Sequence, residues 1–305
     1  MRKQPGAALK SKKPWTFSRF IGEFGGWVFI IPSFILFAFF VWEPMLYGVV
    51  LSFSKLRAFD IVGFAGLENY RYVFSHPYFA KALLNTVQYA FWSLIIGYLV
   101  PIIVAIILNE VVHAQRFFKF VAYFPALVPA VAALLMWQFL LTPGQEGIIN
   151  SILSQLGIAP LQFLQNPNWT IPLLIMTLTW KSAGSTTMVY LASLQGINGE
   201  LYEAASLDGA GVWSKLRYIT LPGIFNTARL MLIMQIISIF QILYEPMVMT
   251  GGGPNNASIS LMYLSYQFAF DKIQFNYAAV VGIVVSVILL ILTAIYMKLV
   301  KPQES

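Results

Sequence analysis

Long uninterrupted apolar stretches dominate the hydropathy pattern of this 305-residue chain. There are six, and most have the length that a helix needs to cross a bilayer, roughly 20 residues; the fifth is shorter and gains residues on its N-terminal side. Backbone groups in hydrocarbon must be bonded within their own segment, and the sequence lacks the short alternating strands of a barrel. We therefore predict six membrane-spanning helices, at about residues 25–50, 83–108, 119–141, 170–193, 226–249 and 276–298.

Composition supports an all-α polytopic membrane protein. Hydrophobic residues make up 58% of the chain and charged residues only 10%, whereas a soluble domain carries about 25% charged residues. The chain has no cysteine, which excludes disulfides, thiolate metal sites and a cysteine nucleophile.

Basic residues indicate orientation rather than nucleic-acid binding, although the net charge is +7. Six of the 19 Lys and Arg residues precede the first apolar stretch, which we interpret as an uncleaved first span. If both termini are cytoplasmic, inner segments hold thirteen basic residues and outer segments five. This bias follows the positive-inside rule and predicts cytoplasmic termini.

Three segments are expected outside the cytoplasm, after the first, third and fifth spans. The second of them predicts a short helix near Ile148–Leu156. The third contains a glycine run, Gly251–Pro254, which is not a phosphate loop because Pro254 lacks an N–H donor and no Lys-Ser/Thr follows. The chain contains no G-x-x-x-x-G-K-[ST] motif, so any use of ATP requires another chain.

The stretch at residues 200–222 is charged although apolar runs flank it. Its pattern predicts a helix from Glu200 to Leu207, a break at Asp208–Gly211, and a second short helix from Val212 to Ile219. Pro222 then ends this unit. Small residues beside the acidic ones would let another backbone approach closely. Physical chemistry alone leaves two interpretations open, a docking element and a solvated cytoplasmic loop.

The same stretch resembles the cytoplasmic signature of binding-protein-dependent ABC importer permeases. The matching segments are Glu203-Ala204-Ala205, Asp208-Gly209-Ala210 and Ile219-Thr220-Leu221-Pro222. Other segments resemble the carbohydrate-uptake, maltose-type branch: GLENYRYVF, FFKFVAYFPALVPAVAALLMWQFLL, MTGGGPNNAS and TWKSAGSTTMVYLASLQGI. Asn198 and Asn226 stand where that branch often has proline.

The resemblance implies a coupling helix between spans four and five that seats in a cytoplasmic ATPase subunit and drives alternating access. Glu203 would pair with a basic residue of the ATPase, and Gly209 would permit the bend. ATP and Mg would be bound by the partner subunits, and this chain would hold no cofactor, metal or catalytic residue. The implied coupling residues are Glu203, Ala204, Ala205, Asp208, Gly209, Ala210, Leu221 and Pro222.

The resemblance also implies residues along the substrate pathway. In span four they are Leu178, Lys181, Ser182 and Ser185, and in span five Gln235, Ser238, Ile239 and Ile242. The alternative for the hydroxyl residues is helix–helix packing. Lys181 would meet an acidic sugar or a phosphate, or its stem would reach to the interface.

We favour a neutral sugar or oligosaccharide as substrate. The alternative is an acidic saccharide or a glycerol-phosphate-type solute, and a more remote one is an ion-coupled secondary transporter. The implied partners are two ATPase subunits, a second and non-identical permease, an extracytoplasmic binding protein and membrane lipid, with no nucleic acid. His76 and His113 lie too far apart in the topology to form a catalytic pair.

These inferences divide the chain into four parts in a bacterial inner membrane. They are a basic cytoplasmic segment at 1–24, the first span with its extracytoplasmic loop at 25–82, the permease domain at 83–300 with its coupling loop at 198–222, and a cytoplasmic tail at 301–305.

Overall fold

The computed structural model describes residues 29–111 and 113–299. It divides into two units, residues 1–50 and 51–305, and each is described by itself. The predicted segments at 1–24 and 301–305 lie outside the described residues.

The described part of the first unit is helical and belongs to a helix that runs Phe29–Ser52. A wider π-helical turn, η1 (Ala38–Trp42), interrupts it before α2 (Glu43–Ser52). Trp42 lies edge-on to Phe34 and Phe37, with ring centroids 5.5 and 5.7 Å away. Apolar side chains along this helix are exposed, which suits a helix whose surroundings are lipid.

A small β-hairpin corrects the all-α prediction. Strands β1 (Ser54–Arg57) and β2 (Asp60–Phe64) pair antiparallel in the first loop. The Asn69 side chain, on α3 (Glu68–Phe74), donates to the carbonyl oxygens of Ser52 and Ser54 at 2.8 and 2.9 Å. The Asn69 amide thus bonds two backbone carbonyls at the start of the hairpin, one of them within β1.

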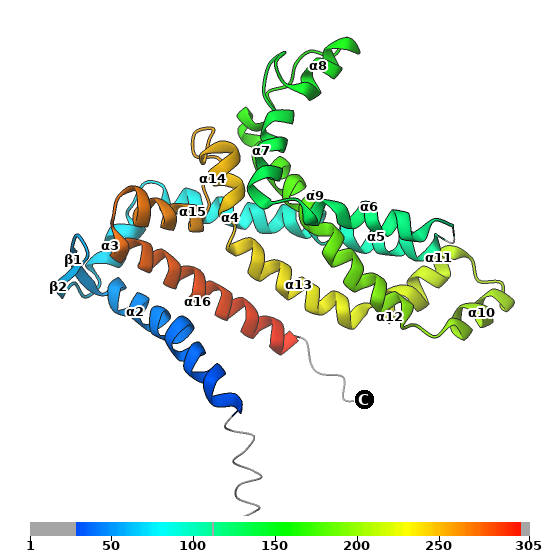
Figure 1. The fold of residues 1–305 in the computed structure, drawn as a ribbon, viewed down its shortest axis with the longest axis horizontal. Helices are drawn as coiled ribbons and strands as arrows, with labels where there is room; N and C mark the ends of the chain where they lie inside the picture. Colours follow the sequence, from blue (N-terminus) through cyan, green and yellow to red (C-terminus); the bar gives the residue numbers. More distant parts are fainter. Residues whose placement is uncertain (1–28, 112, 300–305) are drawn as a thin grey trace, which may run out of the picture. The chain divides into compact units, whose positions relative to one another are not determined.

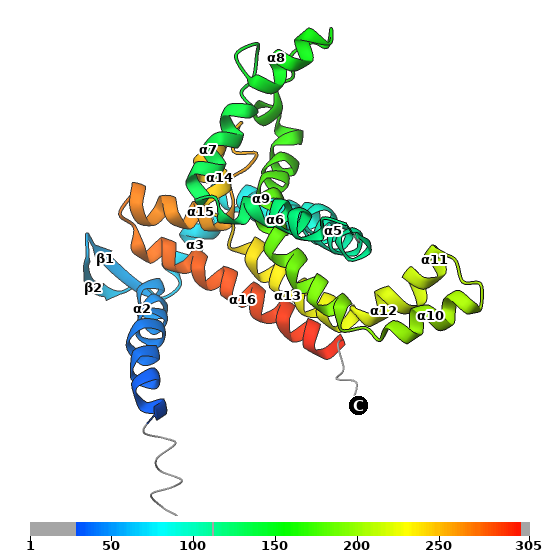
Figure 2. The ribbon, with the colours of Figure 1, turned by 45° about the vertical axis from the view of Figure 1, so that its right-hand side comes forward.

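Helix α9 (Pro167–Gln195) is the centre of the second unit (Figures 1 and 2). Helices α5 (Leu99–Glu110), α6 (Gln115–Leu127) and α13 (Phe225–Phe240) pack against it. Gly184 lets α9 meet the α6 backbone, because a methyl group there would collide with the Ala122 carbonyl oxygen and the Tyr123 Cα.

The predicted third span, at 119–141, is not one straight helix. Its parts, α6 and α7 (Ala130–Leu140), meet at 96°. Val128 is extended, with ψ 133°, and Pro129 follows it. Proline disfavours the α conformation in the residue before it, so the helix ends where the proline begins a new one.

The predicted fifth span, at 226–249, is also broken. Helix α13 ends at Phe240, and α14 (Tyr244–Thr250) begins after a gap. A helix that ran through Ile242 to Pro246 would bring the proline ring against the Ile242 carbonyl. Helix α13 therefore does not continue into α14. The Ile242 carbonyl instead accepts a hydrogen bond from the Ser260 hydroxyl at 2.6 Å.

Short elements complete the second unit. Helix α8 (Ile148–Gln155) confirms the short helix predicted near Ile148–Leu156. The remaining elements outside the charged stretch are α4 (Phe79–Trp92), η2 (Ser93–Gly97), η3 (Phe163–Gln165), α15 (Leu261–Tyr266), η5 (Gln267–Asp271) and α16 (Phe275–Leu299).

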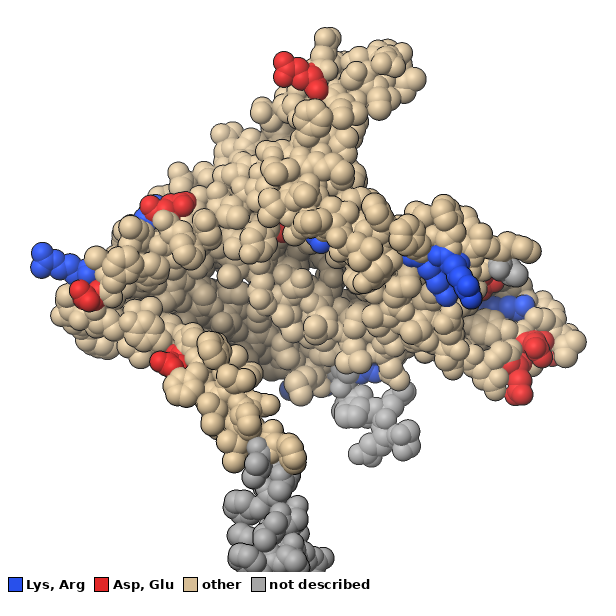
Figure 3. Space-filling model, in the orientation of Figure 1, with Lys and Arg blue, Asp and Glu red and all other residues tan. Residues whose placement is uncertain are grey.

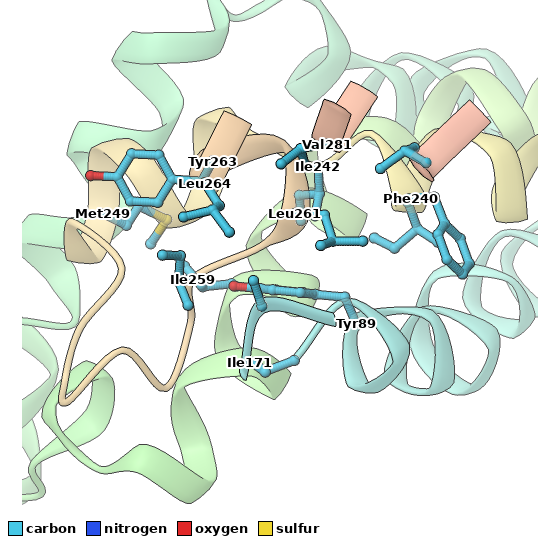
Figure 4. Packing of buried hydrophobic residues seen from close by; sticks show 14 of the residues in the cluster. Tyr89, Ile171, Phe240, Ile242, Met249, Ile259, Leu261, Tyr263, Leu264 and Val281 are labelled. Atoms are coloured by element: carbon cyan, nitrogen blue, oxygen red, sulfur yellow. The ribbon is translucent and has the colours of Figure 1, made fainter. Parts of the chain in front are cut away.

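The largest apolar core joins α4, α9 and α14 to α16. Figure 4 shows Tyr89 lying between Ile171 and the side chains of the 259–264 segment. The Tyr89 hydroxyl donates to the Ser258 carbonyl at 2.9 Å, and the Asn85 amide donates to the carbonyls of Asn256 and Ile259, both at 2.9 Å. Side chains of α4 therefore hold the loop after α14 by bonding to the backbone of that loop.

Three helices in the described residues are long and apolar enough to cross a membrane: Phe29–Ser52, Phe79–Glu110 and Phe275–Leu299. Two bent pairs raise the number to five if each is one span. Helix α9 has 29 residues, or about 43 Å at 1.5 Å per residue, but is not among them. It carries a lysine and several hydroxyl residues, which lower its hydropathy.

Candidate functional site

The charged stretch forms a helical hairpin, residues 199–223, which is called the charged hairpin below. Its first arm is α10 (Gly199–Leu207), where the Asn198 side chain caps the helix by accepting from the Glu200 N–H at 3.0 Å. Its second arm runs Val212–Gly223, through α11 (Val212–Lys215), η4 (Leu216–Thr220) and α12 (Leu221–Gly223). The predicted helix, break and helix are confirmed.

Two local features shape the hairpin. Gly209 has φ +78°, a conformation that glycine adopts without the steric penalty of a Cβ, so the break occurs there. Pro222 was predicted to end the second arm, but the arm continues to Gly223 and bends by 65° into α13. The wider π turn of η4 lies just before Pro222, where an α-helix would have placed a clashing carbonyl.

Most of the predicted coupling residues are exposed on the charged hairpin. Glu203, Ala204, Asp208 and Gly209 are exposed, and so are Leu221 and Pro222, while Ala205 and Ala210 are half-buried. Large apolar side chains beside them are exposed as well: Leu207, Val212 and Trp213. Lys, Arg, Asp and Glu side chains are grouped over this hairpin, at the right of Figure 3.

The acidic side chains of the hairpin have no ion-pair partner among the described residues, where the single ion pair joins Lys55 and Glu68. A mixture of unpaired acids, small residues and exposed apolar side chains is suited to contact with another protein. The same residues would be poorly placed in lipid, where an unpaired charge is costly.

The predicted pathway residues of α9 share one stretch of the helix. Leu178 and Lys181 are half-buried, and Ser182 and Ser185 are exposed. Their hydroxyls donate to carbonyls of the same helix, Ser182 to Leu178 at 2.9 Å and Ser185 to Ser182 at 2.8 Å. Both serines can therefore face an open space without leaving a polar group unbonded.

The predicted pathway residues of the fifth span lie in different surroundings. Ser238 is exposed, but Ile239 and Ile242 are only 1% and 4% exposed and belong to the apolar core. The Gln235 amide donates to the Ser93 hydroxyl at 2.5 Å, next to Gly97. In this structure the two isoleucines and Gln235 are engaged within the chain, and a role in the pathway stays a prediction for them.

Lys181 has an opposite charge nearby. Glu245, at the start of α14, is close enough to interact electrostatically with Lys181, although the two groups do not form an ion pair within 4.0 Å. Helix α14 packs against α9. Lys181 and Glu245 therefore come from two helices that pack together.

An open concavity of about 500 Å³ lies beside the glycine run. Gln138, Thr142 and Gln165 line it together with Thr250 and Pro254. The Gln138 amide donates to the Met249 carbonyl at 3.2 Å, which connects α7 to α14. The glycine run itself turns the chain, with φ +58° at Gly251 and +83° at Gly252.

His76 packs in the connection between α3 and α4. Burial, and secondly the positive charge of Lys272, lower the pKa of His76 below its ordinary value. Its Nδ1 accepts a hydrogen bond from the Tyr78 N–H at 3.3 Å, and its ring lies edge-on to Phe268 at 5.1 Å. No group of three or more His, Cys, Asp or Glu residues within the described ranges is placed to hold a metal.

Sequence reasoning missed the contacts that join the two hairpin arms and those that hold the loop after α14. Asn85, Thr86 and Tyr89 recur on one side of α4, within an apolar run, and all three hydrogen-bond to the backbone of residues 256–261. Polar residues that recur at helical spacing inside a span were a signal for such contacts.

Comparison with known proteins identifies similar chains along nearly the whole length. Residues 97–304 match the family described as binding-protein-dependent transport system inner membrane component. The arabinooligosaccharides transport system permease protein AraP of Bacillus subtilis (strain 168) is 31% identical, over 90% of this chain and 87% of its own. The multiple sugar-binding transport system permease protein MsmF of Streptococcus mutans serotype c is 29% identical, over 95% and 99%.

Solved structures give the same answer for the fold. A bacterial ABC transporter involved in the import of the acidic polysaccharide alginate contains a chain with TM-score 0.80 and 27% identity, covering 93% of this chain and 99% of that one. A chain of the bacterial alginate ABC transporter in complex with an alginate pentasaccharide-bound periplasmic protein has TM-score 0.81 and 26% identity, over 92% and 95%.

Proposed function

Because this chain belongs to the family of binding-protein-dependent transport system inner membrane components, we propose that it is the permease component of an ATP-driven sugar importer. The observation that carries the proposal is the match, in sequence and fold, to sugar-transport permeases over about nine-tenths of the chain. An extracytoplasmic binding protein would deliver the sugar, and ATP hydrolysis on partner subunits would drive alternating access.

In this proposal the chain has six spans, both termini are cytoplasmic, and helix α9 is the fourth span despite its polar residues. A pathway that uses polar side chains needs a span of this kind. The permease domain occupies 83–300, the coupling loop 198–222, and a second, similar permease completes the pathway. Two ATPase subunits bind ATP and Mg, and one of them receives the charged hairpin.

The substrate we propose is a neutral sugar or oligosaccharide. Two relatives support it, the arabinooligosaccharides permease AraP and the multiple sugar-binding permease MsmF. Two relatives support the second candidate, an acidic saccharide: the alginate transporter and the polygalacturonan/rhamnogalacturonan transport system permease protein YteP of Bacillus subtilis (strain 168), 32% identical over 90% of this chain and 87% of its own.

Two measurements test the proposal. The chain is purified from its native membrane, and we expect a second permease and an ATPase to accompany it; sugar uptake in vesicles should then require ATP. Uptake that persists without any ATPase would instead favour the secondary transporter. Binding of sugars to the isolated binding protein distinguishes the candidate substrates. Exclusive binding of a uronate or a phosphoester would show that the substrate is not a neutral sugar.

A further inference from the structure

The two arms of the charged hairpin are joined at their base by apolar packing. Gly223 lies against the Ile197 side chain so closely that a methyl group at residue 223 would collide with it. Leu194, before the first arm, and Ile224, after the second, are 4% and 1% exposed and belong to one apolar cluster. Both ends of the hairpin therefore start from the same small core.

A hydroxyl pair joins the arms above this base. The Tyr202 hydroxyl on α10 lies 3.0 Å from the Thr220 hydroxyl on η4. The Thr220 hydroxyl donates to the Lys215 carbonyl at 3.3 Å. Since a hydroxyl has one proton, Tyr202 is the donor of the pair, and Thr220, only 8% exposed, is fully engaged.

A second bond joins the arms nearer the tip. The Lys215 ammonium donates to the Ser206 hydroxyl at 2.7 Å, and that hydroxyl donates to the Tyr202 carbonyl at 2.6 Å. The Lys215 ammonium is therefore hydrogen-bonded to the opposite arm. It forms no ion pair among the described residues.

These contacts matter because the backbone hydrogen bonds near the tip of the hairpin lie within single arms. Asp208, Gly209 and Ala210 donate backbone N–H bonds back to α10, and the Lys215 N–H donates to the Gly211 carbonyl within the second arm. A Cβ at Gly209 or Gly211 would meet nothing within 4 Å, so neither position is packed against the other arm. Without the two cross-arm bonds, a push on α10 would reach α13 only around the break at the tip or through the apolar base. Through the two cross-arm bonds, it can pass directly into the second arm, which continues into α13.

We propose that Tyr202, Ser206, Lys215 and Thr220 are positioning residues that make the charged hairpin one rigid lever, so that its motion is transmitted to α13. The inference rests on the proposed function, because it assigns the lever to coupling between ATP hydrolysis and transport. None of the four residues needs to touch ATP or sugar.

The test compares conservative variants in the reconstituted importer. Tyr202→Phe and Thr220→Val each remove a cross-arm hydroxyl and nearly preserve shape, Thr220→Ser keeps the hydroxyl, and Tyr218→Phe makes the control change on an exposed tyrosine of the same arm. We expect Y202F and T220V to lower the sugar imported per ATP by about fivefold, the effect of one lost hydrogen bond on an equilibrium. The double variant should equal Thr220→Val, because that variant already lacks the cross-arm bond that Tyr202→Phe removes.

If Y202F, T220V and Y218F import the same amount of sugar per ATP, the proposed lever is wrong. If a wild-type complex that contains its ATPase imports no sugar, the proposed function itself fails, and the lever fails with it. Hydrogen exchange of the purified permease gives a readout that does not depend on transport. Amides of residues 200–207 should exchange faster in Y202F than in Y218F, and equal exchange would also overturn the inference.

Discussion

At the scale of single residues, Glu203 carries the sharpest functional prediction. Its side chain is exposed on a hairpin whose acids have no ion-pair partner in the described part of the chain. In the proposed function it pairs with a basic residue of an ATPase subunit, and reversing its charge would place two like charges together. We expect Glu203→Lys to abolish sugar uptake, measured in vesicles.

The control for Glu203→Lys is the amount of permease in the membrane. Because the residue is exposed and forms no ion pair within the described ranges, insertion should be unchanged, while co-purification with the ATPase should fall. Uptake at the wild-type rate would show that Glu203 does not couple the two subunits.

His76 carries a second residue-scale prediction, on pH. Since its pKa is lowered in the folded protein, the unfolded chain binds more protons just below the ordinary pKa of about 6.5. Stability therefore rises with pH through this window and is lost as the pH falls. Protonation would also remove the acceptor that Nδ1 offers to the Tyr78 N–H. We expect the melting temperature in detergent to fall between pH 7.5 and pH 5.5, and to fall less in His76→Gln. An identical fall in both proteins would rule out this contribution.

At the scale of helices, close backbone contact between α6 and α9 depends on Gly184. A methyl group at residue 184 would meet the Ala122 carbonyl oxygen and the Tyr123 Cα, and backbone cannot move aside as a flexible side chain can. Overpacking of this kind costs about 1–3 kcal/mol. We expect Gly184→Ala to lower the melting temperature of the purified permease.

Gly282 provides the matched control for this prediction. It is also a glycine within a helix, α16, but a Cβ there would meet nothing within 4 Å. Gly282→Ala should therefore be neutral or slightly stabilising, because alanine favours a helix over glycine by about 1 kcal/mol. Equal destabilisation by both substitutions would show that the close α6–α9 contact does not cause the effect of Gly184→Ala.

Particular elements show how far the sequence could predict this fold. Apolar length was enough to locate the helices at 79–110 and 275–299, and local turn chemistry was enough to place the break at Gly209. The bends were missed because apolar length does not register backbone geometry. Pro129 and Pro246 stop their helices through local sterics, although hydrophobic residues continue on both sides.

The candidate site shows the same limit. Most of the residues predicted from the signature are exposed on the hairpin, but the signature gave no indication of the hydrogen bond between Tyr202 and Thr220. These residues are 18 positions apart and meet only because the hairpin folds back. Likewise, no pattern could show that Ile239 and Ile242 would be buried in the core, since burial depends on packing among α4, α9, α15 and α16.

At the scale of the whole molecule, the proposed topology places two loops on opposite sides of the membrane, and each loop carries an exposed leucine. Leu156, after α8, is 70% exposed, and Leu207, at the end of α10, is 90% exposed. Six spans with cytoplasmic termini place Leu156 outside and Leu207 inside, because the whole of α9 lies between them as one span. An α9 that lies along the membrane surface would leave both leucines on one side.

Single cysteines can distinguish these arrangements without background, because the chain has no cysteine of its own. In right-side-out vesicles, a membrane-impermeant maleimide should label Leu156→Cys at once, and Leu207→Cys only after detergent opens the membrane. The two variants make the same leucine-to-cysteine change at positions that are both highly exposed, so a difference in labelling reports the side of the membrane. Rapid labelling of Leu207→Cys in sealed vesicles would place the charged hairpin outside, where no ATPase subunit could reach it, and would contradict the proposed coupling as well as the topology.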